Sequence, residues 1–481
     1  MTIHSAALTN DLPFTANMTD KLWQGDNQHV IHPWEFMQYA GANRRAMIER
    51  GSGIYVYDQD GKKLLDGPAG MWCMALGHGR REIAEVMARQ AEKLAYYSPF
   101  AMASSVAIAF AEELTKHTPG DLNRVFFTNS GSEAVDSAIR FMKFYHNLLG
   151  KPHKKKIIAR EKGYHGATYL CQGITGRERF RPFMDKADQL AIFISSPHLY
   201  FKPAEMSEED FLQNLIKEMN DTIATHGADN IGAFIAEPIQ ASGGVIVPPK
   251  GYLQAMREIC RAHDILYISD EVVTAFGRMG SLFSSSDYFD IVPDIITTAK
   301  GITAGYMPMG AFFLSDKIYN RIAGADKTGG QQGAVFASGF TCSGHPVAAA
   351  VGLKVLEIFQ QEKTMAHVKN IIPYFQRRLR ELLDIPIVGD VRGEGLLGCI
   401  ELVADKKSNK DDNKLLQLDL GVGAMVDNHC YNLGLIVRPI VNLCVMSPPL
   451  TITEPEIDFM IDTLKEGVKR TMMDLKKQGA I

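Results

Sequence analysis

The sequence predicts an α/β protein in which a large domain with a mainly parallel sheet is joined to a smaller α+β domain. Short apolar runs alternate with helical segments between residues 124 and 300. Fully apolar strands of this kind belong to parallel sheets that are covered on both faces. The pattern changes after about Thr341. A chain of 481 residues is also long enough for two cores.

The N-terminal part combines an irregular arm with a hairpin. The first thirty residues are polar and predict an arm or a short helix that lies on another part of the protein. Residues 54–57 and 63–66 flank a turn that contains Gly61, which predicts a β-hairpin. From about residue 82 to 119, apolar residues recur at helical spacing, which predicts helix. Residues 1–70 are therefore assigned to the arm and to part of the smaller domain.

Residues 71–335 are expected to form the large domain. A β-like run at 124–128 is followed by a turn of small residues and by a helix from about 133 to 149, whose apolar residues share one face. Helical segments such as 253–263 separate most of the later strands. Those strands are expected at residues 156–159, 231–235, 265–268 and 295–298.

Residues 336–481 are expected to form the smaller, C-terminal domain. A long helix at 347–359 opens it, and mixed helical and strand-like segments follow. A polar insertion occupies residues 405–414. We find no internal repeat and no low-complexity tract in the chain.

The composition excludes several functional classes. The net charge is −4, so bulk charge favours neither nucleic acid nor an anionic membrane. The basic runs 151–156 and 177–181 are expected to be solvated loops without a role. No stretch approaches the roughly 20 apolar residues of a membrane span, and the N-terminus lacks a signal-peptide pattern. The seven cysteines are scattered without a C-x-x-C pair, which favours free thiols over disulfides or zinc. We therefore expect a cytoplasmic protein with no metal.

Asp270 and Lys300 carry most of the functional prediction. Each follows a short apolar run, and open α/β sheets bind ligands beyond the carboxyl ends of their strands. A pyridoxal-phosphate enzyme needs a lysine that holds the aldehyde as a Schiff base and an aspartate that keeps the pyridine nitrogen protonated. Each residue alone has a structural alternative, a helix cap for Asp270 and a surface lysine before a turn glycine for Lys300. Their occurrence together favours the cofactor.

Ser130, Gly131 and Ser132 form a turn between a predicted strand and a predicted helix. Backbone N–H groups at a helix N-terminus, together with two hydroxyls, can hold a phosphate group. The alternative is a simple helix cap with Glu133 in the first turn. The residues by themselves favour neither interpretation.

Four residues are candidates for the faces of the cofactor and for the substrate end. Tyr164 could stack on a pyridine ring, and Val272, two positions past Asp270 on the same side of its strand, could press the opposite face. Arg438 lies between apolar residues and suggests a fork for a carboxylate. Trp72 is a candidate wall of the substrate pocket. The alternatives are core or rim packing for the two aromatic residues and a buried ion pair for the arginine.

Together these segments resemble the class III aminotransferases, which have the aspartate-aminotransferase-like fold, fold type I of the pyridoxal-phosphate enzymes. The resemblance extends from about Gly53 to Leu450. A single motif is weak, but several occur in the order of the family. They are residues 129–134, 164–166, 236–240, 270–272, 299–301, 340–346 and 391–396.

The resemblance implies a role for each motif. Lys300 and Asp270 would be the catalytic residues, the first bound covalently to pyridoxal 5′-phosphate and the second facing its pyridine nitrogen. Thr341 matches a threonine that reaches the cofactor phosphate of a neighbouring subunit, which implies a homodimer with shared sites or a tetramer built of such dimers. The residues expected to bind the cofactor are Ser130, Gly131, Ser132, Tyr164, His165, Glu237, Asp270, Val272, Lys300, Phe340 and Thr341.

Within the family, residues 70–73, 243–249 and 344–350 look like the branch that acts on ω-amino acids and pyruvate. In that branch the amine side chain would lie in an aromatic pocket, and a mobile arginine would bind the carboxylate of pyruvate. The residues expected at the substrate are Trp72, Tyr164, Phe100 and Arg438.

Two positions depart from the family pattern. Val273 stands where members that act on ornithine or 4-aminobutyrate carry glutamine, which argues against those substrates. Cys342 stands where an aromatic residue is usual, which we expect to affect packing. The amine donor stays open among polyamines, β-alanine, taurine, aromatic amines and long-chain amino alcohols.

The sequence therefore predicts a transaminase that moves an amino group from a primary amine or ω-amino acid to pyruvate and releases alanine. An aminomutase, racemase or decarboxylase with the same cofactor is the nearest alternative. A nicotinamide-dependent oxidoreductase is less favoured, because no G-x-G-x-x-G follows an early strand. A non-catalytic binding protein would leave the pairing of Lys300 with Asp270 unexplained.

Overall fold

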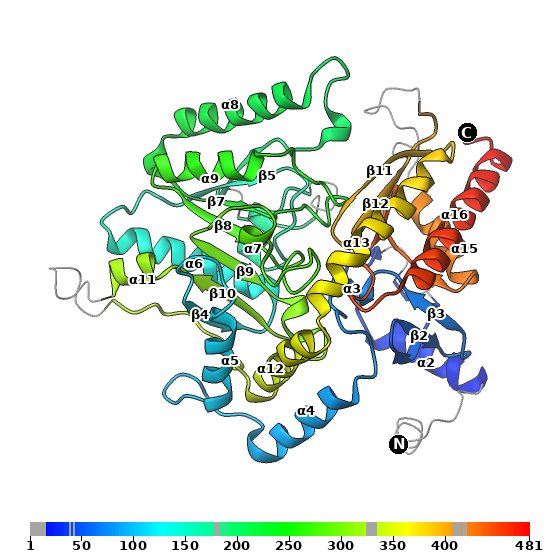
Figure 1. Ribbon diagram of the computed structural model, residues 1–481, viewed down its shortest axis with the longest axis horizontal. Helices are drawn as coiled ribbons and strands as arrows, with labels where there is room; N and C mark the ends of the chain where they lie inside the picture. Colours follow the sequence, from blue (N-terminus) through cyan, green and yellow to red (C-terminus); the bar gives the residue numbers. More distant parts are fainter. Residues whose placement is uncertain are drawn as a thin grey trace.

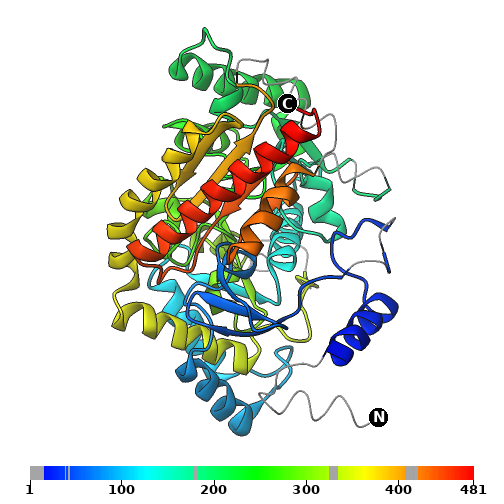
Figure 2. The ribbon, with the colours of Figure 1, turned by 90° about the vertical axis from the view of Figure 1, so that its right-hand side faces the viewer.

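Figure 1 shows a computed structural model of the protein. The structure describes residues 16–37, 40–41, 44–177, 183–187, 189–323, 334–406, 415 and 421–481. A large sheet domain lies beside a smaller domain that both ends of the chain help to build (Figures 1 and 2). The first fifteen residues of the expected arm, and all but the first two residues of the polar insertion 405–414, lie outside the described residues.

The large domain is built on a seven-stranded sheet with the strand order β4-β10-β9-β8-β7-β5-β6. Neighbouring strands from β9 to β6 run parallel, whereas β10 is antiparallel to both of its neighbours. The predicted α/β class with a mainly parallel sheet is confirmed. The strands are β4 (Arg124–Thr128), β5 (Lys156–Arg160), β6 (Ala191–Ile194), β7 (Ile231–Ala236), β8 (Leu266–Asp270), β9 (Ile295–Thr298) and β10 (Gly310–Leu314).

The strands β6 and β10 were not expected from the sequence. All other strands of this sheet form within two residues of their predicted bounds. A buried run of four or five apolar residues cannot be distinguished from a short buried helix by periodicity alone. These two runs are therefore recognised only once the sheet is assembled.

Helices cover both faces of this sheet. On one face lie α6 (Gly131–Leu148), α7 (Tyr169–Ile174) and α11 (Asp316–Ile322), and on the other lie α8 (Glu208–His226) and α9 (Tyr252–Ala262). Successive residues of β5 point to opposite faces, so Ile157 packs in the first core and Ile158 in the second. Burial on both faces explains why these strands are apolar throughout.

The helical pattern predicted from residue 82 to 119 forms two helices, α4 (Arg81–Leu94) and α5 (Ser105–Thr115). Between them lies Pro99, which lacks a backbone N–H and disfavours helical geometry in the preceding residue. The resulting loop brings Phe100 to the surface, where 72% of the residue is exposed.

The smaller domain contains an antiparallel sheet with the order β11-β12-β15-β14. A second sheet, β1-β2-β3-β13, contains the predicted hairpin and joins it to a strand from the C-terminal part. The strands are β1 (Ile48–Ser52), β2 (Tyr55–Asp58), β3 (Lys63–Asp66), β11 (Val388–Glu394), β12 (Leu397–Leu402), β13 (Leu435–Ile436), β14 (Arg438–Ile440) and β15 (Leu443–Met446). The domain boundaries after residues 70 and 335 stay predictions.

The remaining helices connect these layers. The longer ones are α2 (Ala16–His29), α12 (Pro346–Gln361), α13 (Thr364–Arg380), α15 (Val422–Asn432) and α16 (Glu454–Lys477). The short ones are α3 (Ala69–Trp72), α10 (Ser284–Asp287), η3 (Leu199–Phe201), η4 (Ala228–Asn230), η5 (Lys300–Thr303) and η7 (Glu381–Asp384).

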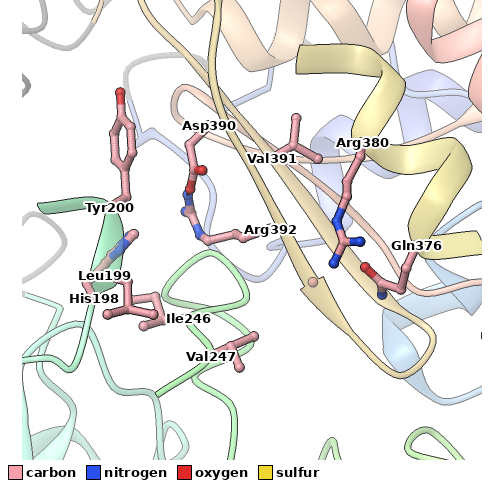
Figure 3. A pocket seen from close by; sticks show the side chains of 11 residues that line it. His198, Leu199, Tyr200, Ile246, Val247, Gln376, Arg380, Asp390, Val391 and Arg392 are labelled. Atoms are coloured by element: carbon pink, nitrogen blue, oxygen red, sulfur yellow. The ribbon is translucent and has the colours of Figure 1, made fainter. Parts of the chain in front are cut away.

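A cavity lies where the two domains meet, between η3 of the large domain and α13 and β11 of the smaller one (Figure 3). Arg392 spans this junction. Its Nε donates a hydrogen bond to the carbonyl of Gly244 at 2.6 Å, and its Nη1 contacts Asp390 at 2.7 Å and Glu401 at 2.8 Å. No lysine of the described chain lines this cavity, so it is not the pocket that the sequence predicts around Lys300.

Other expectations were checked over the same residues. None of the described helices is long and apolar enough to cross a membrane. The described chain holds no cluster of metal ligands, and its cysteines are free thiols.

The expectation of a solvated loop at 151–156 is wrong for Lys154, which is 1% exposed. Its Nζ donates to the carbonyls of Ile231, His263 and Asp264, so this lysine satisfies three backbone oxygens beside the start of β7.

Candidate active site

One pocket gathers most of the predicted site residues at the carboxyl ends of the parallel strands. It lies where β5, β7, β8 and β9 end, which is where open α/β sheets place ligands. Its lining residues are Trp72, Gly131, Ser132, Tyr164, His165, Gly166, Glu237, Ser242, Asp270, Val272, Val273, Ala299 and Lys300.

Lys300 begins the short helix η5, two residues after β9 ends. Its φ of 46° is left-handed, a conformation that a non-glycine residue keeps only when its surroundings impose it. Its Nζ lies 5.6 Å from the centre of the Trp72 ring and has no hydrogen bond or ion pair within the described chain. Burial lowers the pKa of this amine, although Asp270 partly opposes the shift. A more easily neutralised amine is what a nucleophilic lysine needs.

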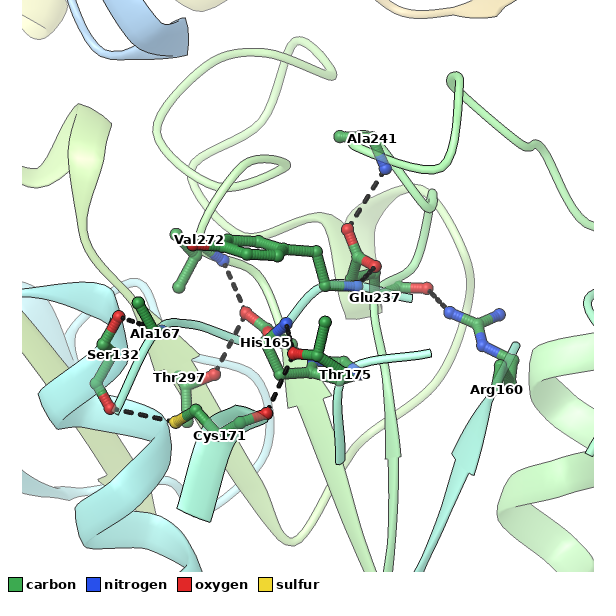
Figure 4. Close-up of polar contacts among 12 residues, drawn as sticks. Ser132, Arg160, His165, Ala167, Cys171, Thr175, Glu237, Ala241, Val272 and Thr297 are labelled. Atoms are coloured by element: carbon green, nitrogen blue, oxygen red, sulfur yellow. Dashed lines mark hydrogen bonds and ion pairs between the residues drawn. The ribbon is translucent and has the colours of Figure 1, made fainter. Parts of the chain in front are cut away.

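Asp270 is the last residue of β8 and is 4% exposed. Its Oδ2 contacts Nδ1 of His165 at 2.7 Å, and its Oδ1 accepts from Thr297 Oγ1 and from the Val272 N–H, both at 3.2 Å. These donors fix the orientation of the carboxylate in the pocket (Figure 4). The sequence predicted His165 as a cofactor ligand, whereas its ring contacts the aspartate. Thr297 was missed, because only the pairing of β8 with β9 brings it opposite Asp270.

The turn before α6 contains both a helix cap and a candidate anion site, the two alternatives that the sequence left open. Ser130 is the helix cap, since its Oγ accepts from the Glu133 N–H at 3.1 Å, and it does not line the pocket. Gly131 and Ser132 do line the pocket, at the N-terminus of α6, where backbone N–H groups favour an anion. A side chain at position 131 would come within 3.0 Å of Val272. Only glycine fits this position without a shift of its neighbour.

Tyr164 is held close to Glu237. The Tyr164 N–H donates to Glu237 Oε1 at 3.0 Å, and the Ala241 N–H donates to Oε2 at 3.1 Å. Burial raises the pKa of Glu237, which is offset in part by His165. Val272 lines the same pocket, but β8 ends at Asp270, so Val272 lies in a turn. The strand argument that placed Val272 was therefore wrong, although the residue does face the site.

The segment after α2 reaches the pocket, which the sequence did not predict. The ring of Trp34 lies 6.2 Å from that of Tyr164, measured between centres. Two contacts hold the segment, His32 Nε2 to Asp26 Oδ1 at 2.7 Å and Arg45 Nη2 to Glu35 Oε1 at 2.6 Å. We call Asp26, His32, Glu35 and Arg45 the N-terminal clasp. No spacing in the sequence links residue 34 with residue 164, so this contact had no detectable signal.

Arg438 does not line the pocket. It opens β14, and its Nε is buried without a hydrogen-bond partner in the described chain. Arg177 lies close enough to interact electrostatically with Arg438, Glu237 and Tyr164, and burial lowers its pKa. Arg177 lies in a loop, as expected for the run 177–181, but it is only partly exposed, and residues 178–181 lie outside the described residues.

Phe100, Phe340 and Thr341 are not brought to the Lys300 pocket by the single chain. Phe100 and Phe340 line a separate cavity of about 480 Å³, and Thr341 is exposed beside it. The Thr341 carbonyl accepts a hydrogen bond from the Tyr96 hydroxyl at 2.8 Å. Large apolar residues surround this cavity at the surface. Their exposed fractions are 58% for Tyr97, 60% for Met102 and 57% for Ile108.

Comparisons with known proteins agree on one family. The family model described as Aminotransferase class-III matches residues 37–468. A putrescine–pyruvate aminotransferase from Pseudomonas aeruginosa is 37% identical over 460 residues, which cover 95% of this chain and 97% of that protein. A mitochondrial gamma-aminobutyrate transaminase 1 from Oryza sativa subsp. indica is 38% identical, with 95% of this chain and 84% of that protein covered.

Solved structures give the same result. The omega transaminase from Pseudomonas jessenii in complex with PMP has a TM-score of 0.88 and 34% identity, over 94% of this chain and 98% of that one. An (S)-enantioselective omega-transaminase from Thermomicrobium roseum has a TM-score of 0.87 and 37% identity, over 95% and 98% of the two chains.

Proposed function

Because the chain belongs to the class III aminotransferases, which are pyridoxal-phosphate-dependent enzymes of fold type I, we propose that it moves an amino group from a primary amine or ω-amino acid to pyruvate. The observation that carries this proposal is the buried amine of Lys300, which has no partner in the described chain and shares a pocket with Asp270. Transfer of the amino group to pyruvate would give alanine.

The residues of this pocket fit pyridoxal 5′-phosphate. Lys300 offers an amine for the aldehyde, Asp270 a buried carboxylate for the pyridine nitrogen, and the N-terminus of α6 a place for the phosphate. Tyr164 and Val272 offer one aromatic and one aliphatic surface for the ring. A Cβ at position 131 would lie 3.0 Å from Val272, so glycine keeps this part of the pocket free of side-chain atoms. When bound, the cofactor supplies covalent capture of the amine and a sink for negative charge.

Lys300 would act as the base of the reaction. Its Nζ would take the proton from the amine-bearing carbon of the donor and would give it up again later in the transfer. Burial favours the neutral form of the amine, which can accept a proton. Trp72, 5.6 Å away, supplies an apolar wall that helps to exclude water from this step.

Asp270 would hold a proton at the pyridine nitrogen. His165 and Thr297 fix its carboxylate, so little reorganisation is needed when charge develops on the ring. Glu237 anchors the backbone of Tyr164 and thereby sets the position of the stacking ring. These residues bind and orient, whereas Lys300 moves the proton.

Pyruvate is proposed as the acceptor because a relative at 37% identity is named a putrescine–pyruvate aminotransferase. Arg438 would bind the carboxylate of the acceptor in a bidentate manner. Val273 lines the pocket where 4-aminobutyrate-type members carry glutamine, which disfavours 4-aminobutyrate as the donor. A relative at 38% identity is nevertheless named for gamma-aminobutyrate, so 4-aminobutyrate belongs in the donor screen.

We also propose that a second copy of the chain covers the face around Phe100. Large apolar residues exposed together mark protein interfaces. In such a homodimer, Phe100, Phe340 and Thr341 of each chain would complete the site of the other. Light scattering of the purified protein tests this proposal, since a monomer at micromolar concentration contradicts it.

The activity is tested with purified protein supplied with pyridoxal 5′-phosphate. An absorption band at about 410–420 nm that borohydride removes would report the covalent bond to a lysine. A screen of polyamines, β-alanine, taurine, 4-aminobutyrate and aromatic amines, with pyruvate fixed and alanine measured, then identifies the donor. Formation of no alanine from any of these donors would contradict the proposed function.

A further inference from the structure

We infer that Asp427 is a positioning residue that attracts Arg438 and competes for it with the carboxylate of the acceptor. The inference rests on the proposed role of Arg438 in acceptor binding and deepens it. It makes the choice between charged and uncharged substrates depend on a residue of α15, a helix that does not line the pocket.

The packing of α15 against β13 and β14 places Asp427 beside the backbone that precedes Arg438. Asp427 lies in the middle of α15 and is partly buried. Its Oδ1 accepts a hydrogen bond from the Val437 N–H at 3.4 Å, next to the backbone from which Arg438 extends. Because β14 is an edge strand of its sheet, no further strand covers Arg438 on that side.

Arg438 is not firmly bound where it lies. Within the described chain it forms no hydrogen bond or ion pair, and its Nε is buried without an acceptor. A buried donor without a partner is costly, so a better acceptor can draw the guanidinium away. A carboxylate that enters the pocket would be such an acceptor, because it can take two hydrogen bonds from one arginine.

Asp427 is the carboxylate that can compete for Arg438. The titratable groups that interact with it are Arg438 of β14, Cys444 of β15 and Cys430 of its own helix. Burial raises the pKa of Asp427 to about 6, while the hydrogen bond from Val437 and the charge of Arg438 oppose the shift. The carboxylate therefore attracts Arg438 above that pH and releases it below.

Arg177 is a second charge near Arg438. The two guanidinium groups repel each other, and Arg177 is attracted to Glu237. Without an acceptor, repulsion from Arg177 and attraction to Asp427 both disfavour entry of Arg438 into the pocket. A carboxylate near both arginines would relieve this repulsion.

The test compares two acceptors with one uncharged amine donor. Pyruvate carries a carboxylate, and propanone keeps its three-carbon skeleton and its C2 carbonyl without the carboxylate, so the ratio of their kcat/KM values isolates carboxylate binding. Asp427→Asn keeps the shape and an oxygen for the Val437 N–H. It should raise the ratio about fivefold, as expected for loss of one partly screened attraction between a carboxylate and a guanidinium group. Asp474→Asn is the matched control, because Asp474 contacts His429 of the same helix at 2.8 Å and should leave the ratio unchanged.

The double variant and a pH series complete the test. Arg438→Leu should lower the ratio about 10- to 100-fold, as expected for loss of a charge-assisted hydrogen bond. Adding Asp427→Asn to Arg438→Leu should then change the ratio by less than about twofold, because the two residues act through each other. In the wild type the ratio should rise as the pH falls through about 6. This dependence should vanish in Asp427→Asn and persist in Asp427→Glu.

The outcomes separate this inference from the proposed function. A ratio that Asp427→Asn leaves unchanged, or changes equally in the Arg438→Leu background, overturns the role of Asp427. A ratio that Arg438→Leu leaves unchanged overturns the role of Arg438 itself. If Asp427→Asn does not fold, the pH dependence of the wild type and of Asp427→Glu decides, and a flat ratio in both contradicts the inference.

Discussion

The Lys300 pocket and the face around Phe100 differ in how completely a single chain builds them. In the pocket, Asp270 accepts from three donors and Glu237 from two backbone N–H groups. On the face, Phe100 is 72% exposed and Met102 60% exposed, and no described element covers them. One region is polar, buried and hydrogen-bonded, and the other is apolar and open.

The difference teaches where one chain is sufficient. Strand ends position the residues proposed for the cofactor, because neighbouring strands fix each other through backbone hydrogen bonds. Of the residues proposed for the substrate, Phe100 lies on a surface that the same chain leaves exposed. Exposed apolar area of this kind is stabilised by association with another surface. Substitutions in the two regions should therefore have different kinetic signatures.

The largest effect is expected for Lys300→Ala. Loss of both the covalent anchor and the base should lower turnover by about 10⁴-fold or more. Alanine formation from pyruvate measures this loss. Lys317→Ala, at an exposed lysine outside the pocket, is the control and should keep full activity. Full turnover in Lys300→Ala would remove the basis for treating the pocket as the catalytic region.

A charge on the apolar face should have the next largest effect. Phe100→Asp places a carboxylate in an area that we propose to be buried between two chains, and burial of an unpaired charge opposes association. We expect a shift toward monomer in light scattering and a fall in kcat/KM of about 100-fold, while the lysine-bound absorption band stays. Tyr319→Asp, at another partly exposed aromatic residue, is the control. A dimer that survives in Phe100→Asp would show that this face is not the interface.

His165→Phe tests the inner layer of the pocket. It removes the donor to Asp270 Oδ2 while it keeps a ring in the buried position. Loss of one hydrogen bond to a buried carboxylate should lower kcat about 10- to 100-fold. KM should change little, because His165 is placed against Asp270 and not at the substrate. The side chain in His165→Gln can still donate a hydrogen bond. If His165→Gln lowers kcat as much as His165→Phe does, and also lowers the thermal stability, the role of His165 is purely structural.

The smallest effect is expected at Trp34. Its ring packs beside Tyr164 and is held by the N-terminal clasp. Trp34→Ala should raise KM for aromatic amines about 2- to 10-fold, the range expected for one lost aromatic contact, with kcat nearly constant. Glu35→Gln should give a weaker effect of the same kind, because it loosens Arg45. An equal change in KM for small and bulky donors would contradict a contact with the substrate.

The sequence by itself determined the fold class and the chemistry of the pocket. Apolar runs of strand length predicted most of the parallel sheet, and Asp270 and Lys300 follow two of those runs. This was possible because the end of a buried strand is visible in the sequence as a change from apolar to polar residues. The turn at residues 130–132 was recognised for the same reason, since it lies between a strand and a helix.

Tertiary structure alone decided which residues meet across the sheet and between domains. Thr297 contacts Asp270 through strand pairing, the ring of Trp34 packs near that of Tyr164, and Asp427 contacts Val437 through helix packing. Contacts between residues far apart in the chain depend on how whole elements pack, and local periodicity carries no information about that packing. The same reason explains why Lys154, which the sequence places in a solvated loop, is buried in the fold, and why Arg177 is partly buried.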